Sequence, residues 1–78
     1  MTIISFDELS RRNGKNGRRA WVAFEGFVYD VTDSFLWKNG EHQVLHHAGS
    51  DLTEEIAEAP HSGDLFAGFP VVGKLAKP

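Results

Sequence analysis

The sequence AWVAFEGFVYDV, residues 20–31, consists of two apolar runs separated by Glu25-Gly26. Both runs are rich in aromatic and β-branched residues, which suit a pleated and half-buried surface. A two-residue connection that ends in Gly is typical of a tight turn between antiparallel strands. We therefore predict a β-hairpin with strands at residues 20–24 and 27–31.

Different patterns flank this hairpin. Ser5-Phe6-Asp7-Glu8 matches a capping box, so a short helix should follow and end at Asn13-Gly14. Three further short helices are expected because each candidate segment is followed by Gly or Pro, which end helices. They lie at residues 43–48, 52–59 and 63–67. A closing strand is expected at residues 69–75, with Pro70 near its start, where a missing N–H does least harm. These elements predict an α+β fold.

Length and composition indicate one domain, residues 1–78, with a small core. The chain has 78 residues, of which 41% are hydrophobic, and no Cys. The lack of Cys excludes disulfides, thiolate metal sites and covalent haem attachment. A domain of this size buries only about 60% of its unfolded surface, so a noncovalent cofactor or partner is expected to stabilise it.

No apolar run reaches the ~18 residues of a membrane span. We expect a cytoplasmic monomer.

Charge is distributed unevenly around a formal net charge of −3. Five basic residues gather near the N-terminus: Arg11, Arg12, Lys15, Arg18 and Arg19. They are not interleaved with aromatic residues and match no nucleic-acid motif, so we interpret them as a solvated loop. Residues 41–64 contain no Lys or Arg and hold six acids. All four histidines also lie there: His42, His46, His47 and His61. Metal-ligating chemistry is therefore expected in this segment.

The histidine spacing allows more than one metal site. His42 and His46 stand four apart, and on the predicted helix they would share one face. This is the spacing of a zinc hydrolase helix, but Gln43 occupies the place of the Glu that must act as general base. Gln cannot take a proton from water, so we do not expect a zinc hydrolase. A structural zinc site from His42, His46 and His61 stays as an alternative.

Two neutral imidazoles that approach from opposite sides can instead bind haem iron, which requires a large apolar slot between them. Apolar residues that could line the slot are frequent in the second half of the chain. They are Val31, Phe35, Leu36, Leu45, Leu52, Ile56, Leu65, Phe66 and Phe69. The same residues could simply form the core. The two interpretations are compatible, because a flat macrocycle in so small a domain is itself part of the core.

Four segments fall in the order and roughly the spacing found in cytochrome b5-like haem-binding domains. They are VYDVT at residues 28–32, AGSDLTE at 48–54, APHS at 59–62 and VVGKL at 71–75. The chain resembles this family from about Phe6 to Leu75, and most of all its short prokaryotic haem/steroid-binding branch. The resemblance implies a small sheet with pairs of short helices around a haem crevice, and noncovalent haem b as the cofactor.

The resemblance also implies the metal ligands. His61 follows a helix end in the same way as the second ligand of the family. The family's first ligand lies in a His-Pro-Gly-Gly turn, whereas this chain has WKNGEH at residues 37–42. The first ligand is therefore His42 or His46. We favour His42, because on a helix the face one turn before Leu45 would point into the crevice. His46 would then donate a hydrogen bond to a haem propionate or orient the ligand.

A haem with two His ligands has no open coordination position, so the resemblance implies an electron carrier and not an enzyme. The acids of residues 41–64 are expected to surround the haem edge and attract a basic redox partner. Alternatively, Asp51, Glu54 and Glu55 complement a helix N-terminus. The competing functional class is a haem- or small-ligand-binding interaction module of the membrane-associated progesterone-receptor type, without an electron-carrier role.

Overall fold

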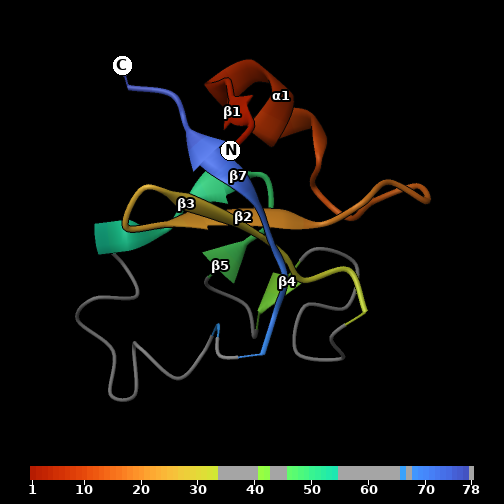
Figure 1. Cartoon of the computed structure of the whole chain (residues 1–78). Coiled ribbons are helices and arrows are strands. Elements are labelled where there is room, and N and C mark those ends of the chain that lie inside the picture. The colour runs from red at the N-terminus through yellow and green to blue at the C-terminus, as the bar shows by residue number, and fades with distance from the viewer. Residues whose placement is uncertain (34–40, 43–45, 55–65, 67, 78) are drawn as a thin grey trace.

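The computed structural model describes residues 1–33, 41–42, 46–54, 66 and 68–77, with only the backbone at 41–42 and 46–47 (Figure 1). One helix and seven strands are bounded in this part of the chain, and two further helical residues, Thr53 and Glu54, lie at the edge of the described stretch 46–54. They are β1 (Ile3–Ile4), α1 (Phe6–Arg11), β2 (Trp21–Phe24), β3 (Phe27–Asp30), β4 (Glu41–His42), β5 (His46–His47), β6 (Ser50–Asp51) and β7 (Val71–Leu75). A five-stranded sheet has the order β1-β7-β3-β2-β6, and β4 pairs with β5. The predicted α+β fold class is confirmed.

The predicted hairpin is confirmed and forms the middle of the sheet. β2 and β3 pair antiparallel, with Phe24 opposite Phe27. The connecting residues Glu25 and Gly26 both have positive φ, at 50° and 85°. Two successive left-handed residues match the twist of a two-residue hairpin, and Gly adopts this conformation without steric cost.

The predicted N-terminal helix is confirmed at its start. The backbone N–H of Glu8 donates to Ser5 Oγ at 3.0 Å, so Ser5 is the N-cap. The helix ends at Arg11, slightly before the predicted Asn13-Gly14. Leu9 is its buried residue and attaches α1 to the sheet.

The predicted closing strand is confirmed as β7, which is antiparallel to β3 and parallel to β1. Its Gly73 is required by the close passage of the N-terminal strand. A Cβ atom at this position would lie 2.5 Å from the carbonyl oxygen of Thr2 and 2.7 Å from Ile4 Cδ1. Only a residue without a side chain allows β1 and β7 to pair this closely.

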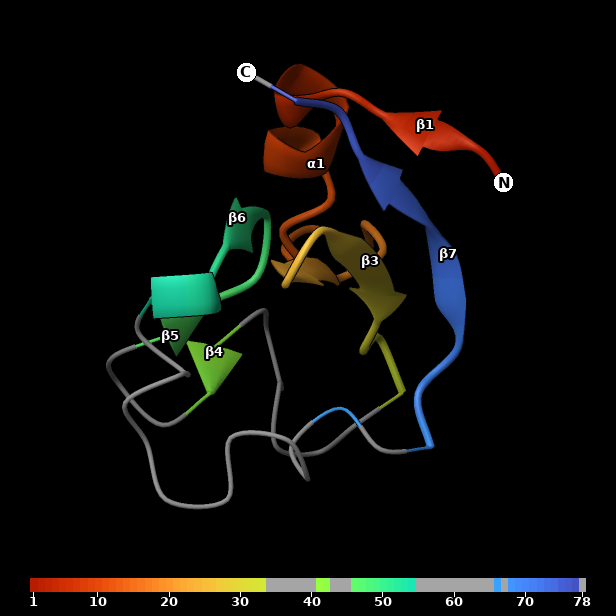
Figure 2. The ribbon, with the colours of Figure 1, turned by 60° about the vertical axis from the view of Figure 1, so that its left-hand side comes forward.

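The sheet is buried on both faces, and alternate residues of β2 belong to different clusters. Trp21 and Ala23 pack on the α1 side, in a cluster with Leu9 and Val28. Val22 and Phe24 pack on the opposite side. Figures 1 and 2 show α1 on one side of the sheet and the β4–β5 pair on the other. The period-2 alternation of strand side chains thus divides a short chain into two small cores.

The predicted helix at residues 43–48 is wrong. His46–His47 is a strand that pairs antiparallel with Glu41–His42. The chain then turns at Gly49, with φ of 88°, and enters β6, which pairs parallel with β2. Six residues are too few to stabilise a helix by themselves, so pairing and burial of this segment decide its conformation.

The other two predicted helices are described only in part. Thr53 and Glu54 are helical, in agreement with the start of the helix expected at residues 52–59. Residues 55–59 lie outside the described part, as does most of the segment 63–67. Within the described ranges, no helix has the length and hydropathy needed to cross a bilayer.

Candidate functional site

An apolar cluster covers the face of the sheet that lies away from α1. We call it the site-face cluster. It contains Ala20, Val22, Phe24, Val31, Ala48, Leu52 and Phe66, with Tyr29 and Phe69 packed against it. Four residues that the sequence predicts for the slot are brought together here, namely Val31, Leu52, Phe66 and Phe69. Their contact with a cofactor stays a prediction.

The remaining predicted site residues are not placed by the structure. Phe35, Leu36, Leu45, Ile56, Leu65 and His61 lie outside the described residues. For His42 and His46 the backbone register is known, and the two residues stand directly opposite each other in the β4–β5 pair. They are therefore neighbours across two strands and not along one helix.

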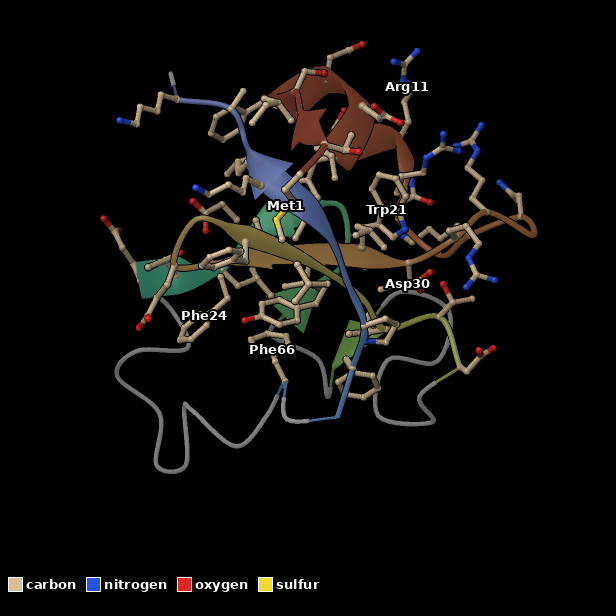
Figure 3. All side chains as sticks on the ribbon, viewed as in Figure 1. Met1, Arg11, Trp21, Phe24, Asp30 and Phe66 are labelled. Atoms are coloured by element: carbon tan, nitrogen blue, oxygen red, sulfur yellow. The ribbon has the colours of Figure 1, made fainter. Side chains whose placement is uncertain are left out.

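Phe66 is the centre of an aromatic group in the site-face cluster. Its ring stacks on Tyr29, with centroids 4.9 Å apart and an interplanar angle of 16°. It also lies 5.2 Å from the ring centroid of Phe24, tilted by 37°. Figure 3 shows Phe24 and Phe66 on the same side of the sheet. Tyr29 and Phe24 were not predicted for the site. The alternation of residues within the predicted hairpin indicates which residues share a face, but not which face meets Phe66.

A turn at residues 30–32 positions Val31 at the start of β2. Asp30 Oδ1 accepts hydrogen bonds from the backbone N–H of Thr32, at 3.0 Å, and from its hydroxyl. The Thr32 hydroxyl oxygen accepts the N–H of Ala20 at 2.9 Å. The N–H of Val31 donates to the carbonyl oxygen of Ala20 at 2.8 Å. Val31 is fully buried in the site-face cluster as a result.

Asp30 is held in its charged form. Its side chain is only 11% exposed. Burial by itself would raise the pKa of this carboxyl, but the hydrogen bonds from Thr32 and Arg19 outweigh it and leave the pKa lowered. Arg19 donates to Asp30 Oδ2 from Nε at 3.1 Å and from Nη2 at 2.7 Å. In turn, the carboxylate raises the pKa of Arg19.

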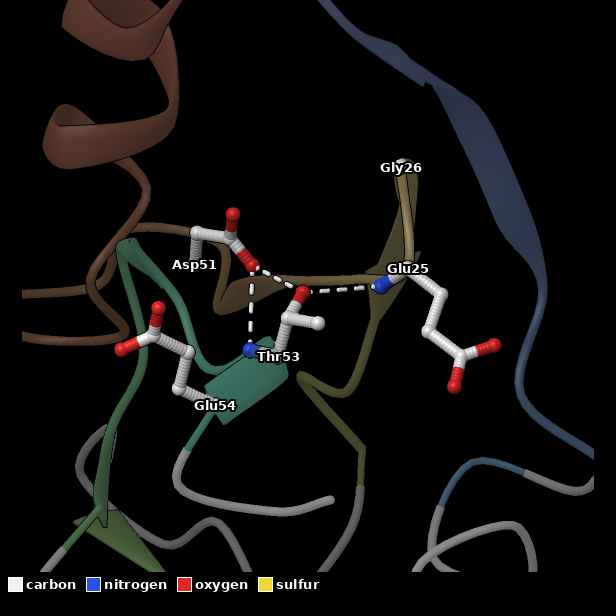
Figure 4. Close-up of a pocket in the computed structure, with 5 residues that line it drawn as sticks. All are labelled: Glu25, Gly26, Asp51, Thr53 and Glu54. Atoms are coloured by element: carbon white, nitrogen blue, oxygen red, sulfur yellow. Dashed lines mark hydrogen bonds between the residues drawn. The ribbon is translucent and has the colours of Figure 1, made fainter.

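A second turn, at residues 51–53, positions Leu52 at the other end of β2. Figure 4 shows Asp51 and Thr53 of this turn beside Glu25. Asp51 Oδ1 accepts hydrogen bonds from the N–H of Thr53, at 3.1 Å, and from its hydroxyl. The Thr53 hydroxyl oxygen accepts the N–H of Glu25 at 2.9 Å. The N–H of Leu52 donates to the carbonyl oxygen of Ala23 at 2.9 Å. Leu52 is 4% exposed.

The surface beside the second turn is acidic. Glu25, Asp51 and Glu54 line an open depression of about 380 Å³, together with Gly26 and Thr53. Glu25 and Glu54 are exposed. This end of β2 therefore presents negative charge next to the site-face cluster.

The basic segment lies at the other end of β2 and pairs with the chain's own acids. Arg11 lies 3.0 Å from Asp7, and Arg12 lies 3.4 Å from Glu8. The guanidinium of Arg12 also lies over the ring of Trp21, 5.1 Å from its centroid. Arg11 is the last residue of α1 and Arg12 is its C-cap, so the predicted solvated loop begins only after them.

The chemistry of the site face suits a large apolar ligand. The buried residues of the site-face cluster are all apolar. Apolar and aromatic side chains that exclude water are what a flat macrocycle requires of its pocket. Three grouped carboxylate or imidazole ligands for a bare metal ion are not found in the described ranges. The zinc alternative depends on the side chains of His42, His46 and His61, which the structure does not describe, and stays untested.

Residues 5–76 match the family model "Cytochrome b5-like Heme/Steroid binding domain". Two similar solved structures cover nearly the same length. A cytochrome b5 domain protein from Hadesarchaea YNP_N21 is 58% identical, with a TM-score of 0.91 over 97% of this chain and 100% of its own. A cytochrome b5 domain protein from Methanococcoides burtonii is 46% identical, with a TM-score of 0.91 over 97% of this chain and 99% of its own.

Curated relatives are much longer proteins. An NADH-cytochrome b5 reductase-like protein, alnC, from Emericella nidulans is 33% identical over 75 residues, which are 92% of this chain and 16% of that protein. Nitrate reductase [NADH] 1 from Phaseolus vulgaris is 43% identical over 60 residues, which are 74% of this chain and 6% of that protein. The chain thus spans less than a fifth of either relative.

Proposed function

The chain belongs to the family of cytochrome b5-like heme/steroid-binding domains, and on that premise we propose that it is a b-type haem protein with two His ligands that carries single electrons to a redox partner. Haem b would be held without a covalent bond. The proposal assigns the chain no enzymatic activity of its own. The resemblance of residues 28–32, 48–54, 59–62 and 71–75 to the family motifs supports the same cofactor.

The observation that carries this proposal is the site-face cluster. Val31, Leu52 and Phe66 are buried on the sheet face away from α1 and come from three separate parts of the chain. Such side chains exclude water and give the pocket a low dielectric, which favours an apolar macrocycle over solvent. Phe35, Leu36, Leu45, Ile56, Leu65 and Phe69 are proposed to complete the lining.

His61 and His42 are the proposed axial ligands, with His46 as the hydrogen-bonding neighbour. His42 was favoured on the basis of a helix at residues 43–48, but His46–His47 is a strand. The backbone register that sets His42 opposite His46 keeps both in the same neighbourhood. Neutral imidazoles would occupy both axial positions and leave no room for a substrate on the metal.

When bound, the haem iron supplies reversible one-electron chemistry. The chain's own residues bind the group, keep water out and define where partners approach. The acidic depression formed by Glu25, Asp51 and Glu54 supports docking of a basic partner surface, which would be transient and weaker at high salt. Both longer relatives are named as reductases or reductase-like proteins, which supports a redox partner for this domain.

A second candidate is a haem- or small-ligand-binding interaction module without an electron-carrier role. The family description includes steroid binding, which favours this alternative. The two functions differ in the state of the metal. Two His ligands leave carbon monoxide little access, whereas an open site binds it readily.

The test is a hemin titration of the purified chain, followed by absorption spectra of the oxidised and reduced forms with and without carbon monoxide. We expect one equivalent of hemin, a low-spin spectrum and little change with carbon monoxide. His61→Ala should lose the low-spin spectrum, while His47→Ala, the matched control, should keep it. A folded chain that ignores hemin would refute the proposal, and strong carbon monoxide binding would favour the interaction module.

A further inference from the structure

We propose that Thr32 and Thr53 are positioning residues that hold the two ends of the haem pocket in place by joining them to β2. The inference rests on the proposed function, because it concerns the walls of that same pocket. It starts from two turns with the same sequence pattern, Asp-Xaa-Thr, at residues 30–32 and 51–53.

The two turns make the same set of hydrogen bonds. In each, the Asp Oδ1 accepts from the backbone N–H and from the hydroxyl of the Thr two residues later. In each, the Thr hydroxyl oxygen then accepts a backbone N–H from a residue flanking β2. That residue is Ala20 for Thr32 and Glu25 for Thr53. A hydroxyl can donate and accept at the same time, and an apolar side chain of equal size can do neither.

Each turn therefore has two attachments to the region of β2. Besides the Thr contact, the middle residue donates its own N–H to a carbonyl oxygen: Val31 to Ala20, and Leu52 to Ala23. Ala20 and Glu25 are five residues apart, which is about 16 Å along an extended chain. Val31 and Leu52 belong to one apolar cluster but are attached near opposite ends of this span. The rigid strand then sets the distance between these two walls.

The two backbone N–H groups that bond to Thr32 and Thr53 differ in their access to water. Ala20 is 2% exposed, so water cannot easily satisfy its N–H after Thr32→Val. Glu25 is exposed, so water can satisfy its N–H after Thr53→Val. We therefore expect Thr32→Val to weaken the fold itself. Thr53→Val should leave the chain folded and loosen only the wall that carries Leu52, which makes it the sharper test.

The experiment compares Thr53→Val with Thr53→Ser, which keeps the hydroxyl. Thr2→Val is the control, at an exposed residue that is the only Thr in the chain besides Thr32 and Thr53. Haem dissociation is measured by transfer to excess apomyoglobin, at a temperature where unfolding curves show every variant fully folded. Haem should dissociate from Thr53→Val about tenfold faster than from the parent chain, as expected for the loss of the hydrogen bond between the Glu25 N–H and the Thr53 hydroxyl. Thr53→Ser should restore the parent rate to within about twofold, as should Thr2→Val.

Amide hydrogen exchange of the haem-free chain gives a readout that does not involve haem. Thr53→Val should expose the amides of Leu52 and Glu25 to faster exchange, and Thr53→Ser should not. Equal dissociation rates for Thr53→Val and the parent chain would overturn the inference, as would equal behaviour of the Val and Ser variants. A parent chain that takes up no hemin would instead refute the proposed function, and the inference with it.

Discussion

Phe66 stacks almost parallel on Tyr29, with ring centroids 4.9 Å apart and an interplanar angle of 16°. Tyr29 belongs to β3, whereas Phe66 precedes β7, so the contact joins two parts of the chain 37 positions apart in sequence. An offset aromatic pair of this kind adds about 0.5–1.5 kcal/mol beyond its buried area. The aromatic group formed by Phe24, Tyr29 and Phe66 therefore depends on contacts between residues far apart in the sequence.

Phe66→Ala should be among the most destabilising single changes. The side chain is 4% exposed and contacts both Tyr29 and Phe24. Truncation leaves a cavity and removes two ring contacts, so the free energy of unfolding should fall by about 3–5 kcal/mol. Urea unfolding of the haem-free chain measures it. Phe6→Ala, at a residue 44% exposed, is the control and should change stability by less than about 1 kcal/mol. Equal effects of the two variants would contradict the assignment of Phe66 to the core.

Gly73→Ala should destabilise the pairing of β1 with β7. The added Cβ would overlap the carbonyl oxygen of Thr2 and Ile4 Cδ1. Overpacking of this kind costs about 1–3 kcal/mol, which thermal unfolding can detect. Ile4→Val in the same background removes Cδ1 but leaves the backbone oxygen in place, so it should restore little. Full recovery in the double variant would show that the side chain, and not the backbone, is the obstacle.

Asp30 should make the fold sensitive to acid. Its pKa is lowered in the folded chain, so its contribution is fully present above the unfolded pKa of about 4 and is lost as the pH falls through the lower folded pKa. Unfolding free energies measured from pH 6 down to pH 2 should show this loss in the parent chain. In Asp30→Asn, the free energy of unfolding should depend less on pH in this acidic range. Asp7→Asn is the control, because the Asp7 side chain is 79% exposed in its ion pair with Arg11. It should leave the pH dependence of the unfolding free energy as in the parent chain.

Ser5→Ala should weaken α1 without touching the site. The Ser5 hydroxyl accepts the N–H of Glu8 and is the N-cap of the helix. Loss of such a cap costs about 1 kcal/mol. Thermal unfolding should reveal this decrease, whereas hemin affinity should stay within about twofold of the parent chain, because α1 lies on the other face of the sheet. Ser5→Asp keeps an acceptor at the N-cap and should retain the stability.

The choice of first ligand can be settled with paired variants. If His42 is the ligand, His42→Ala should abolish the low-spin spectrum, and His46→Ala should only shift it or speed haem loss. The reverse pattern would move the ligand to His46. Spectra at saturating hemin, with carbon monoxide as a probe of an open position, distinguish the outcomes.

Local patterns predicted local structure well. Glu25-Gly26 indicated the hairpin because two adjacent residues with positive φ make that turn. Ser5 indicated the start of α1 because its hydroxyl meets an N–H three residues away. The apolar residues Val31, Leu52, Phe66 and Phe69 were chosen by residue type, and the fold brings them into one cluster.

The failure at residues 43–48 shows where such reasoning stops. The four-residue spacing of His42 and His46 is compatible with a helix, but it also allows two short strands that pair, as Glu41–His42 and His46–His47 do. Tyr29 and Phe24 were missed because their role depends on Phe66, which is distant in sequence. No local pattern contains that information.

By itself, the sequence determined the hairpin, the capped helix, the closing strand and the family to which the chain belongs, because these depend on residues only a few positions apart or on motifs kept in order. Tertiary structure alone decided the parallel pairings of β1 with β7 and β2 with β6, the extended conformation of His46–His47, and the attachment of the two Asp-Xaa-Thr turns to the ends of β2. The parallel pairings and the turn attachments join residues at least twelve positions apart, and only the burial of the shared core offsets the entropy lost in closing such loops. His46–His47 pairs with the nearby Glu41–His42, and a four-residue spacing does not by itself distinguish such a pairing from a helix.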